Sequence, residues 1–483
     1  MKKAKAKMTK ILFVTAECSG FAPVGGLAEV AGSLPQAIMN EDSSFDVRVV
    51  MPLYKKIMDA YHKELTFVGE STVNLAWRNQ YVGVFTLKKN GVNYYFVDNK
   101  YYFDRFGVYG HFDDGEKFAF FSKSIFEVMR IIDFYPNIIH TNDWHSALVN
   151  IYLDILYKKE GTYMDIKSIF TIHNLEYQGI YGLEFLENVI GIDKKYQDII
   201  EFNGFINLMK GAIICSDLVT TVSPRYAREI ATSQYGWGLE NIIRMNKHKV
   251  MGIINGIDYD SYNPLTDKAI YTNYDLESLD KKKENKAKLQ AELGLEVTPF
   301  LPVFSVISRL VSQKGIDILA EAIQGFVDLG AQVIVLGTGD HALEDNMRAL
   351  ASNPNVKVLI TFNQDLARKI YAGSDFFLMP SKFEPCGLSQ MIASRYGTVP
   401  IVRETGGLYD TIVDYYASSD GNGFTFKDYT SYALYLKGKD AVELYRYHYD
   451  EYVELQKRCM AKDFSWNASA KCYIETYNNL LKQ

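Results

Sequence analysis

Short apolar segments alternate with segments of helical spacing along almost the whole chain. The first series of apolar segments lies at residues 11–16, 47–51, 94–97, 138–140, 168–172, 218–222 and 250–254. The second series lies at residues 303–307, 333–336, 356–359, 376–379 and 399–402. Strands and helices that alternate in this way form parallel sheets with helices on both faces. The two series therefore predict an α/β protein made of two units.

The length of the chain supports the same division, because 483 residues are too many for one ordinary core. The connection between the units is predicted at residues 255–264. We accordingly place one domain at residues 1–256 and a second at residues 257–460. The last segment, residues 461–483, has helical spacing, with Ser465 as a plausible N-cap.

The composition excludes several classes of protein. A net charge of −6 disfavours a surface for nucleic acid or for an anionic membrane. No apolar run approaches the length of a membrane span, and the run at residues 11–16 is shorter than the core of a secretory signal. The five cysteines have no metal-binding spacing, which predicts reduced thiols and a cytoplasmic location.

Two Gly-Gly-Leu turns, one near each end of the chain, follow predicted strands and open predicted helices. They contain Gly25 and Gly26 in the first case and Gly406 and Gly407 in the second. Glycine lets backbone N–H groups approach a ligand closely, and a helix N-terminus favours negative charge. If the two turns face each other, they can hold a phosphorylated ligand between two domains.

Charged residues follow the strands of the second unit, where ligands bind in open α/β sheets. Arg309 and Lys314 lie five residues apart around a turn after residues 303–307. Both can reach a pyrophosphate, although an ordinary solvated pair of cations is the alternative interpretation. Glu384 lies ahead of a tight turn formed by Pro385 and Gly387. Its carboxylate can accept hydrogen bonds from sugar hydroxyls, or it can cap the following helix.

Polar residues also follow two strands of the first unit. His173 comes directly after residues 168–172, and the sequence Asp143-Trp144-His145 follows residues 138–140. A histidine at this edge can bind a sugar hydroxyl or stabilise developing charge, whereas a single histidine is more often structural. In the second segment Asp143 is the better candidate for a functional residue.

Three other patterns carry no function. Residues 337–342 fit the G-x-G-x-x-A pattern, but the acidic residue of a nicotinamide site is missing after the next strand. The Asp258-Tyr259-Asp260 sequence lacks supporting carboxylates, so no metal site is predicted. A Walker-type P-loop sequence is absent as well.

The motifs together resemble a known family. They are, in order, residues 25–30 (GGLAEV), 143–145 (DWH), 173–179 (HNLEYQG), 221–230 (TVSPRYAREI), 255–258 (NGID), 308–315 (SRLVSQKG), 384–388 (EPCGL) and 405–408 (TGGL). This ordered set resembles bacterial glycogen synthases and plant starch synthases, which are retaining glucosyltransferases of glycosyltransferase family 5. The resemblance covers essentially the whole chain.

The resemblance implies a fold and an activity. The fold is GT-B, in which two Rossmann-like domains face each other across a deep cleft and a C-terminal helix crosses back to the first domain. The first domain would bind the α-glucan acceptor (glycogen or a maltooligosaccharide), and the second the nucleotide-glucose. The reaction would transfer glucose from ADP-glucose to the 4-OH at a non-reducing glucan end, with retention of configuration. No metal and no cofactor besides the donor substrate would take part.

The resemblance also implies a role for each site residue. His173 would contact the donor glucose, Glu384 would hold its hydroxyls, and Arg309 and Lys314 would neutralise the leaving pyrophosphate. Tyr109 and Asp143 would position the acceptor and donor glucose. The remaining donor-binding positions would be Gly25, Gly26, Asn255, Cys386, Gly387, Leu388, Thr405, Gly406 and Gly407.

The first turn departs from the family pattern. The family has Lys-x-Gly-Gly-Leu, whereas this chain has Pro23 at the position of the lysine, which is associated with donor binding. Three interpretations remain open. Another cation can substitute; the enzyme can use another donor, for example UDP-glucose, or another acceptor; or the protein can be a weakly catalytic glucan-binding relative.

Overall fold

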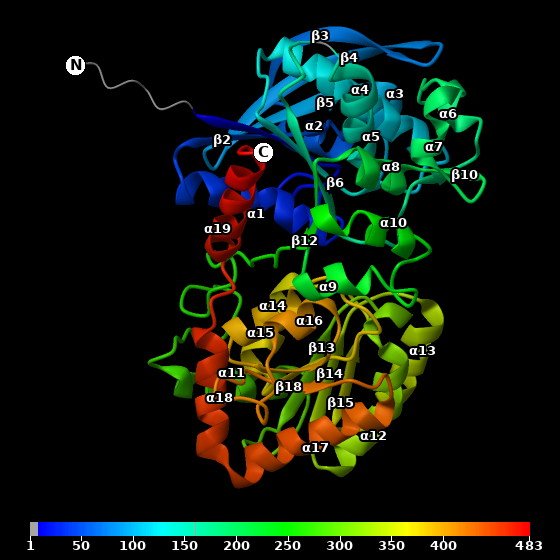
Figure 1. Cartoon of the computed structure of the whole chain (residues 1–483). Coiled ribbons are helices and arrows are strands. Elements are labelled where there is room, and N and C mark those ends of the chain that lie inside the picture. Colours follow the sequence, from blue (N-terminus) through cyan, green and yellow to red (C-terminus); the bar gives the residue numbers. More distant parts are fainter. Residues whose placement is uncertain (1–7, 160) are drawn as a thin grey trace. The chain divides into compact units, whose positions relative to one another are not determined.

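The computed structural model describes residues 8–159 and 161–483. The chain forms two compact units (Figure 1). Unit one contains the described residues up to Val222, together with Ala227–Gly256 and Trp466–Gln483. Unit two contains Ser223–Tyr226 and Ile257–Ser465.

Unit one is built on a nine-stranded sheet in the order β12-β11-β7-β6-β1-β2-β5-β4-β3. The strands from β12 to β5 are parallel, and β3 and β4 form an antiparallel hairpin at one edge. Their bounds are β1 Thr9–Val14, β2 Phe45–Pro52, β3 Thr66–Leu75, β4 Arg78–Lys89, β5 Val92–Asp98, β6 Ile138–Asn142, β7 Lys167–Ile172, β11 Leu218–Thr221 and β12 Val250–Gly252. A small antiparallel sheet adds β8 Ile180–Tyr181, β9 Glu201–Phe202 and β10 Phe205–Asn207.

Helices connect these strands, as the alternating pattern predicts. Their bounds are α1 Gly26–Glu41, α2 Lys55–Tyr61, α3 Lys100–Phe103, α4 Asp114–Ile131, α5 Trp144–Tyr152, α6 Phe185–Asn188, α7 Gln197–Ile200, α8 Leu208–Cys215, α9 Pro224–Glu229 and α10 Glu240–Met245. The C-terminal helix α19 (Trp466–Leu480) also belongs to unit one. It is tied to the sheet by the hydroxyl of Tyr477, which lies 2.7 Å from Nδ1 of His140 in β6. Both side chains are buried, so this contact lies in the core.

Unit two is built on a six-stranded parallel sheet in the order β15-β14-β13-β16-β17-β18. The strands are β13 Val303–Ile307, β14 Gln332–Leu336, β15 Val356–Leu359, β16 Phe376–Met379, β17 Val399–Arg403 and β18 Phe424–Phe426. The helices are α11 Lys282–Glu292, α12 Ile316–Asp328, α13 His341–Leu350, α14 Gln364–Gly373, α15 Ser389–Arg395, α16 Gly406–Thr411, α17 Ser431–Tyr447 and α18 Tyr449–Ala461. Figure 1 shows α17 and α18 in orange and red along the outside of this unit.

The helices of unit two pack through apolar stripes. In α12 the side chains of Ile316, Leu319, Ile323 and Phe326 are buried, at a spacing of three and four residues. This spacing places them on one face of the helix, which packs into the same core as Phe304 of β13. Sequence periodicity is therefore sufficient to orient this helix on its sheet.

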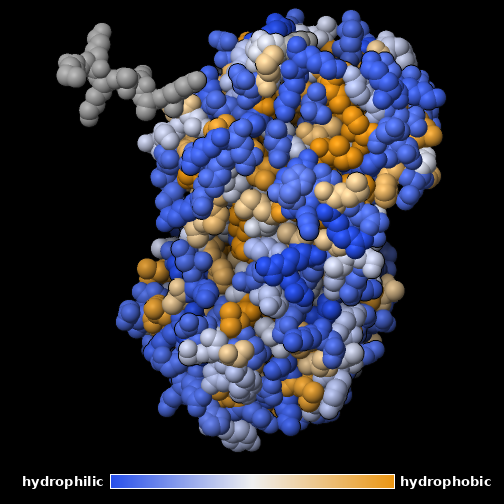
Figure 2. All heavy atoms as spheres, in the orientation of Figure 1, coloured by the Kyte–Doolittle hydropathy of each residue, from blue (hydrophilic) through white to orange (hydrophobic). Residues whose placement is uncertain are grey.

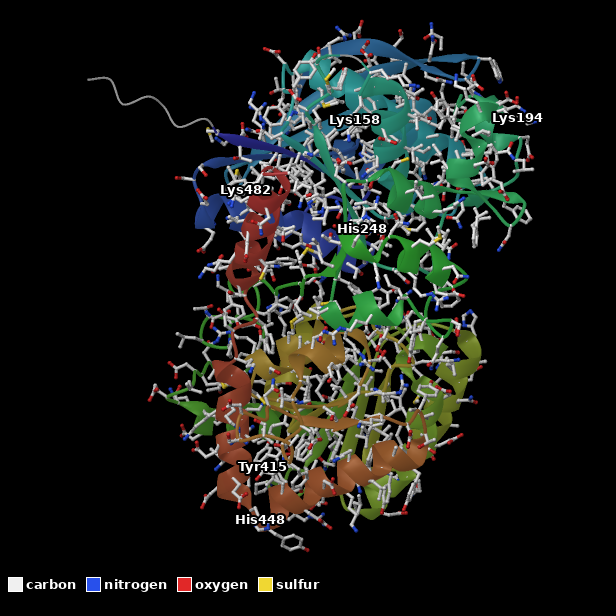
Figure 3. The ribbon with its side chains drawn as sticks, viewed as in Figure 1. Lys158, Lys194, His248, Tyr415, His448 and Lys482 are labelled. Atoms are coloured by element: carbon white, nitrogen blue, oxygen red, sulfur yellow. The ribbon has the colours of Figure 1, made fainter. Side chains whose placement is uncertain are left out.

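The corner between α17 and α18 is fixed by one carboxylate. Glu451 accepts a hydrogen bond of 2.5 Å from the hydroxyl of Tyr415, and its other oxygen lies 3.3 Å from Nδ1 of His448 (Figure 3). His448 is the residue that separates the two helices. These contacts tie the start of α18 to the loop that carries Tyr415.

The visible surface is dominated by hydrophilic side chains, and apolar side chains gather only in small patches (Figure 2). Among the described helices, none has the length and apolar character needed to cross a membrane.

The α/β prediction is confirmed. Each predicted strand corresponds to an observed one, and those at residues 303–307, 356–359 and 376–379 have the observed bounds. The β3–β4 hairpin was missed. Much of β3 is half-buried or exposed, so its sequence lacks the continuous apolar run that marks a buried parallel strand.

Candidate active site

The first Gly-Gly-Leu turn is organised by Glu17. One carboxylate oxygen of Glu17, Oε2, accepts hydrogen bonds from the N–H groups of Val24 (3.0 Å) and Gly25 (2.7 Å). A Cβ on Gly26 would meet nothing within 4 Å, and one on Gly25 would meet only Oε2 of Glu17 at 3.9 Å. Internal packing therefore does not require these two glycines. What the two glycines do is leave the backbone of this turn open to the close approach of a ligand.

Tyr109 is joined to the same carboxylate. Its hydroxyl donates a hydrogen bond of 2.5 Å to Oε1 of Glu17, and its ring stacks on His145 with centroids 4.5 Å apart. Glu17 thus connects the first turn to the loop that carries Tyr109. The sequence pattern placed Glu17 after the first strand but gave it no role.

Asp143 and His173 lie side by side at the carboxyl ends of β6 and β7. Oδ1 of Asp143 accepts a hydrogen bond of 2.8 Å from the N–H of His173. The φ angle of Asp143 is +54°, which is an unfavourable conformation for a residue with a side chain. Backbone strain of this kind concentrates at functional sites.

Burial raises the pKa of the Asp143 carboxyl to about 7, against the effect of the amides of His173 and Asn174 and with a contribution from the Glu17 carboxylate. Four of the residues predicted for the site in unit one, Gly25, Tyr109, Asp143 and His173, are therefore connected by hydrogen bonds and by charge through Glu17.

The imidazole of His173 is held as a neutral ring. Burial lowers its pKa to about 3. Its Nε2 lies 2.9 Å from Oδ1 of Asn142, whose amide orientation is fixed because Nδ2 donates to the carbonyl oxygen of Val14 at 3.0 Å. Nε2 is therefore the protonated nitrogen and Nδ1 is an acceptor. Such a ring can accept a hydrogen bond from a sugar hydroxyl.

Asn255 supplies another acceptor in unit one. It is buried, and its Oδ1 has no hydrogen-bond partner within the described part of the chain. A buried polar atom without a partner is unfavourable, so such atoms often mark a place where a ligand or water binds.

Glu384 and Lys314 form the centre of the site in unit two. Nζ of Lys314 lies 2.6 Å from Oε2 of Glu384, which also accepts a hydrogen bond of 3.1 Å from Oγ of Ser381. Glu384 is 5% exposed, and the Lys314 side chain is 19% exposed. The sequence analysis gave these residues separate roles, whereas here each one orients the other. Among the described residues, none donates a hydrogen bond to Oε1 of Glu384, which leaves this oxygen for a ligand.

The turn that carries Lys314 is packed closely against the loop after β16. Gly315 has a φ angle of +72°, and a Cβ there would lie 2.1 Å from the carbonyl oxygen of Pro380. The N–H of Lys382 donates to the carbonyl oxygen of Gln313 at 2.8 Å. This contact requires glycine at position 315, and it fixes the distance between Lys314 and Glu384.

Arg403 is a positioning residue that sequence reasoning missed. Its buried guanidinium donates to the carbonyl oxygens of Ser381 (3.3 Å), Lys382 (2.7 Å) and Lys427 (3.0 Å). It therefore holds the loop that leads to Glu384. The only feature of the sequence that could have identified Arg403 is its position at the end of β17.

Arg309 has a different environment. It lies at the carboxyl end of β13, and its side chain is exposed. It forms no ion pair with any residue of the described ranges. Its guanidinium is therefore available to an anionic ligand.

The second Gly-Gly-Leu turn differs from the first. A Cβ on Gly406 would lie 1.9 Å from the carbonyl oxygen of Glu384, and one on Gly407 would lie 2.1 Å from that of Cys386. The N–H of Gly407 donates to the carbonyl oxygens of Glu384 and Pro385, both at 3.1 Å. These glycines are thus required for packing against the Glu384 loop. The amide of Gly407 is engaged inside the protein, so its predicted contact with a diphosphate has to compete with these bonds.

The other predicted donor-binding residues lie around this packed turn. Cys386 and Thr405 are buried, and Gly387 has a φ angle of +73° that favours glycine. Leu388 directly precedes α15. Gln390, which received no role from the sequence, donates to the carbonyl oxygens of Cys386 and Gly387 at 3.2 and 2.9 Å. These positions therefore form one structural unit with Glu384.

Within the described residues, no group of three or more His, Cys, Asp or Glu side chains has the geometry to hold a metal ion. Arg309 and Lys314 supply positive charge to the site in unit two, and the buried guanidinium of Arg403 lies behind the Glu384 loop.

Comparison with known proteins identifies the family. Residues 10–245 match the family described as starch synthase catalytic domain, and residues 289–452 match glycosyl transferases group 1. The glycogen synthase of Lactobacillus acidophilus is 44% identical over 98% of this chain and 100% of its own length. The glycogen synthase of Clostridioides difficile is 43% identical over 98% of this chain and 99% of its own length.

A solved structure agrees with these relatives. The catalytic domain of starch synthase IV from Arabidopsis thaliana, bound to ADP and acarbose, has a TM-score of 0.90 and 32% identity over 99% of this chain and 100% of that one. The sucrose-phosphate synthase of Thermosynechococcus elongatus, at 15% identity and a TM-score of 0.61, shares the fold alone. The GT-B fold implied by the motifs is thereby confirmed. The chain belongs to the family of bacterial glycogen synthases and plant starch synthases, and it is a glucosyltransferase of that family.

Proposed function

We propose that this glucosyltransferase transfers glucose from ADP-glucose to the 4-OH at the non-reducing end of an α-1,4-glucan, with retention of configuration. The support for the donor is the related starch synthase, which was solved with ADP. The support for the acceptor is the same protein's bound acarbose, together with the glycogen synthases among the relatives. Unit two would bind the nucleotide-glucose and unit one the glucan.

Arg309 and Lys314 would stabilise the leaving group. Breaking the bond between glucose and a diphosphate leaves positive charge on the sugar and negative charge on the departing ADP. A fixed cation that lies where this negative charge develops stabilises the transition state more than it stabilises the bound substrate. Arg309 is exposed and forms no ion pair with a described residue, while Lys314 is held in place by Glu384. Because these two side chains supply the charge, we propose that the reaction needs no metal and no further cofactor.

Three acceptor atoms would bind the hydroxyls of the donor glucose. They are Oε1 of Glu384, Nδ1 of the neutral His173 and Oδ1 of Asn255. Among the described residues, none donates a hydrogen bond to any of these three atoms. A sugar hydroxyl can therefore donate to each of them without displacing an internal partner. Tyr109 and Asp143 would position the sugars, and Gly25 and Gly26 would admit them close to the backbone.

Lys56 is our candidate for the cation that replaces the family lysine. Pro23 cannot supply a charge, and Glu17 lies beside it at the first turn. Burial lowers the pKa of Lys56 in α2, and the Glu17 carboxylate opposes this shift, so the lysine is within electrostatic reach of the first turn. Among the described residues no cysteine forms a disulfide, which supports a cytoplasmic enzyme.

The observation that carries the proposal is the Lys314–Glu384 pair beside the unpaired Arg309. The test is incorporation of labelled glucose into glycogen from ADP-glucose and, in parallel, from UDP-glucose, with purified protein. We expect a higher kcat/KM with ADP-glucose. Preference for UDP-glucose would refute the donor assignment.

The second candidate function, a glucan-binding relative without turnover, is favoured only by Pro23. It predicts retardation in a native gel containing glycogen but no incorporation from either donor. Activity that appears only in the Pro23→Lys variant would establish this alternative.

A further inference from the structure

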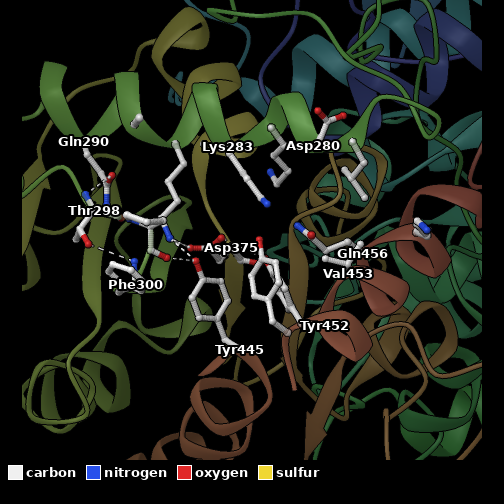
Figure 4. Close-up of a pocket in the computed structure, with 18 of the residues that line it drawn as sticks. Asp280, Lys283, Gln290, Thr298, Phe300, Asp375, Tyr445, Tyr452, Val453 and Gln456 are labelled. Atoms are coloured by element: carbon white, nitrogen blue, oxygen red, sulfur yellow. Dashed lines mark hydrogen bonds and ion pairs between the residues drawn. The ribbon is translucent and has the colours of Figure 1, made fainter. Parts of the chain in front are cut away.

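Unit two contains a cavity at the opposite end of its sheet from Lys314 and Glu384. It has a volume of about 840 Å³ and lies between α11 and the corner of α17 and α18 (Figure 4). Asp375, which lines it, directly precedes β16 and accepts a hydrogen bond of 2.8 Å from the N–H of Val303 at the start of β13. The cavity therefore lies at the amino ends of these strands. Ligands of open α/β sheets, and the predicted donor site here, lie at the carboxyl ends.

The floor of the cavity is a closed polar network. Nζ of Lys286 lies 2.7 Å from Oδ2 of Asp375 and donates to the hydroxyl of Tyr445 at 2.8 Å. That hydroxyl donates in turn to the carbonyl oxygen of Pro299 at 2.6 Å. Lys282 donates to the carbonyl oxygens of Tyr371 and Ala372 and to Oγ1 of Thr398. A ligand with many hydroxyls, such as a glucan end, finds few free partners on this floor.

The walls of the cavity are largely apolar. The rings of Tyr449 and Tyr452 lie 5.6 Å apart on one side. At the rim the apolar side chains of Leu276, Val297 and Phe300 are 37, 55 and 78% exposed. Aromatic walls of this kind suit a planar apolar body, and the volume is within the range of small-molecule sites, about 300–1,000 Å³.

The charge of the cavity is positive. Four cationic side chains (Lys283, Lys286, Arg446 and Lys457) outnumber three acidic ones (Glu277, Asp280 and Asp375), while burial lowers the pKa of the fifth basic residue, Lys282, to about 7. Lys283 is directed from α11 toward the tyrosines, and its Nζ lies 5.2 Å from the ring centroid of Tyr449 (Figure 4). Within the described ranges, Lys283 forms no ion pair and no hydrogen bond, and the hydroxyl of Tyr449 has no hydrogen-bond partner. A free ammonium therefore stands beside an aromatic wall.

We propose that this cavity binds a small amphipathic anion. Its apolar body packs against Tyr449, which the buried ring of Tyr452 supports, and against Phe300, and its terminal phosphate or carboxylate binds Lys283. The hydroxyl of Tyr449 adds a hydrogen bond to the same group. This site lies outside the transferase chemistry and does not rest on it.

The test uses a matched pair of fluorescent probes on the full chain. 1-Anilinonaphthalene-8-sulfonate is an amphipathic aromatic anion, and N-phenyl-1-naphthylamine is the same ring system without the sulfonate. We expect the anion to bind more tightly than the neutral probe. Lys283→Ala should weaken the anion about fivefold and leave the neutral probe unchanged. Tyr449→Ala should weaken both probes at least about fivefold.

The control variants are Lys288→Ala, in α11 but outside the cavity, and Tyr447→Ala, an exposed tyrosine near the end of α17. Thermal unfolding followed by circular dichroism verifies that every variant is folded. Displacement of the probe by phenyl phosphate identifies a phosphate-bearing ligand, and displacement by phenylacetate a carboxylate-bearing one. The proposal is overturned if neither displaces the probe, if Lys283→Ala binds the anion like wild type, or if the controls weaken it equally.

Discussion

Nζ of Lys314 lies 2.6 Å from Oε2 of Glu384, in a pair that joins the turn after β13 to the loop after β16. Because Glu384 is buried and Lys314 only partly so, the pair fixes the ammonium and still exposes part of it. Arg309, at the end of the same strand β13, has no such partner among the described residues. The two cations predicted to bind the diphosphate are therefore positioned in different ways, and their variants should behave differently.

We expect Arg309→Ala and Lys314→Ala each to lower kcat at least about 100-fold. Each variant lacks one of the two cations that would stabilise the negative charge of the leaving group in the transition state. Only Lys314→Ala should also lower the melting temperature, because it leaves the buried Glu384 carboxylate without its partner. Glucose incorporation and thermal unfolding measure the two effects.

Lys439→Ala is the control, since Lys439 forms an exposed pair with Glu443 on α17. Retention in a glycogen gel should be unchanged in all three variants. Equal loss of retention and turnover would show that Arg309 and Lys314 are structural.

Glu17→Ala tests the organisation of the first turn. It removes the acceptor for the amides of Val24 and Gly25 and for the hydroxyl of Tyr109. We expect kcat/KM for the donor to fall at least about tenfold, since a small misplacement of positioning groups is costly. Tyr109→Phe, which removes one of the three bonds, should have a smaller effect. If Tyr109→Phe were the more damaging change, Glu17 would not be the organiser of this turn.

Lys56→Ala tests whether Lys56 substitutes for the family lysine. Lys55→Ala is the matched control, because Lys55 pairs at 3.6 Å with Asp59 and with Asp104. We expect KM for ADP-glucose to rise about threefold to tenfold in Lys56→Ala alone, as for the loss of one charge-assisted contact. Pro23→Lys should restore the lost affinity in the Lys56→Ala background. Equal KM values in both single variants would exclude Lys56.

Asp143 should make stability depend on pH. The folded carboxyl has a pKa of about 7, above that of an unfolded aspartate, so the folded state binds the extra proton between these values. Stability from this group is therefore present at low pH and is lost as the pH rises toward 7. Asp143→Asn keeps an oxygen for the amide of His173 and removes the ionisation.

We expect the variant to gain stability relative to wild type between pH 5 and 8, by roughly 2–4 kcal/mol at most. Denaturant unfolding at several pH values measures this difference. A constant difference across the range would mean that Asp143 is ionised throughout.

His173→Ala should lower kcat by about 10²-fold, as expected for loss of a group that stabilises the transition state. Because burial lowers the pKa of His173 to about 3, the ring is neutral at working pH. The shape of the profile of kcat against pH from 5 to 9 should therefore be the same in the variant and in wild type. An ionisation near pH 6 that disappears in His173→Ala would contradict the neutral ring.

The strands of unit two illustrate how far the sequence could predict the fold. β16 is a short continuous apolar run because both faces of a central parallel strand are buried, and β13 departs from this pattern only at Ser305, which makes the bounds of both strands readable. The β3–β4 hairpin is an edge with one face partly exposed, and its mixed pattern carried no comparable signal. Arg309, Asp143, His173 and Glu384 could be selected from the sequence because ligands of open α/β sheets bind beyond the carboxyl ends of the strands. All four residues follow predicted strands.

By itself, the sequence determined the architecture, the family and the identity of the candidate residues, because periodicity and motif order are properties of the chain. The tertiary structure decided how those residues are paired. Only folding brings Lys314 to Glu384 across 70 residues, Tyr109 to Glu17 across 92, and His173 to the carboxylate of Asp143. The two Gly-Gly-Leu turns look equivalent in sequence. They differ in the structure because a Cβ would enter open space at Gly26 and would clash with a carbonyl at Gly406.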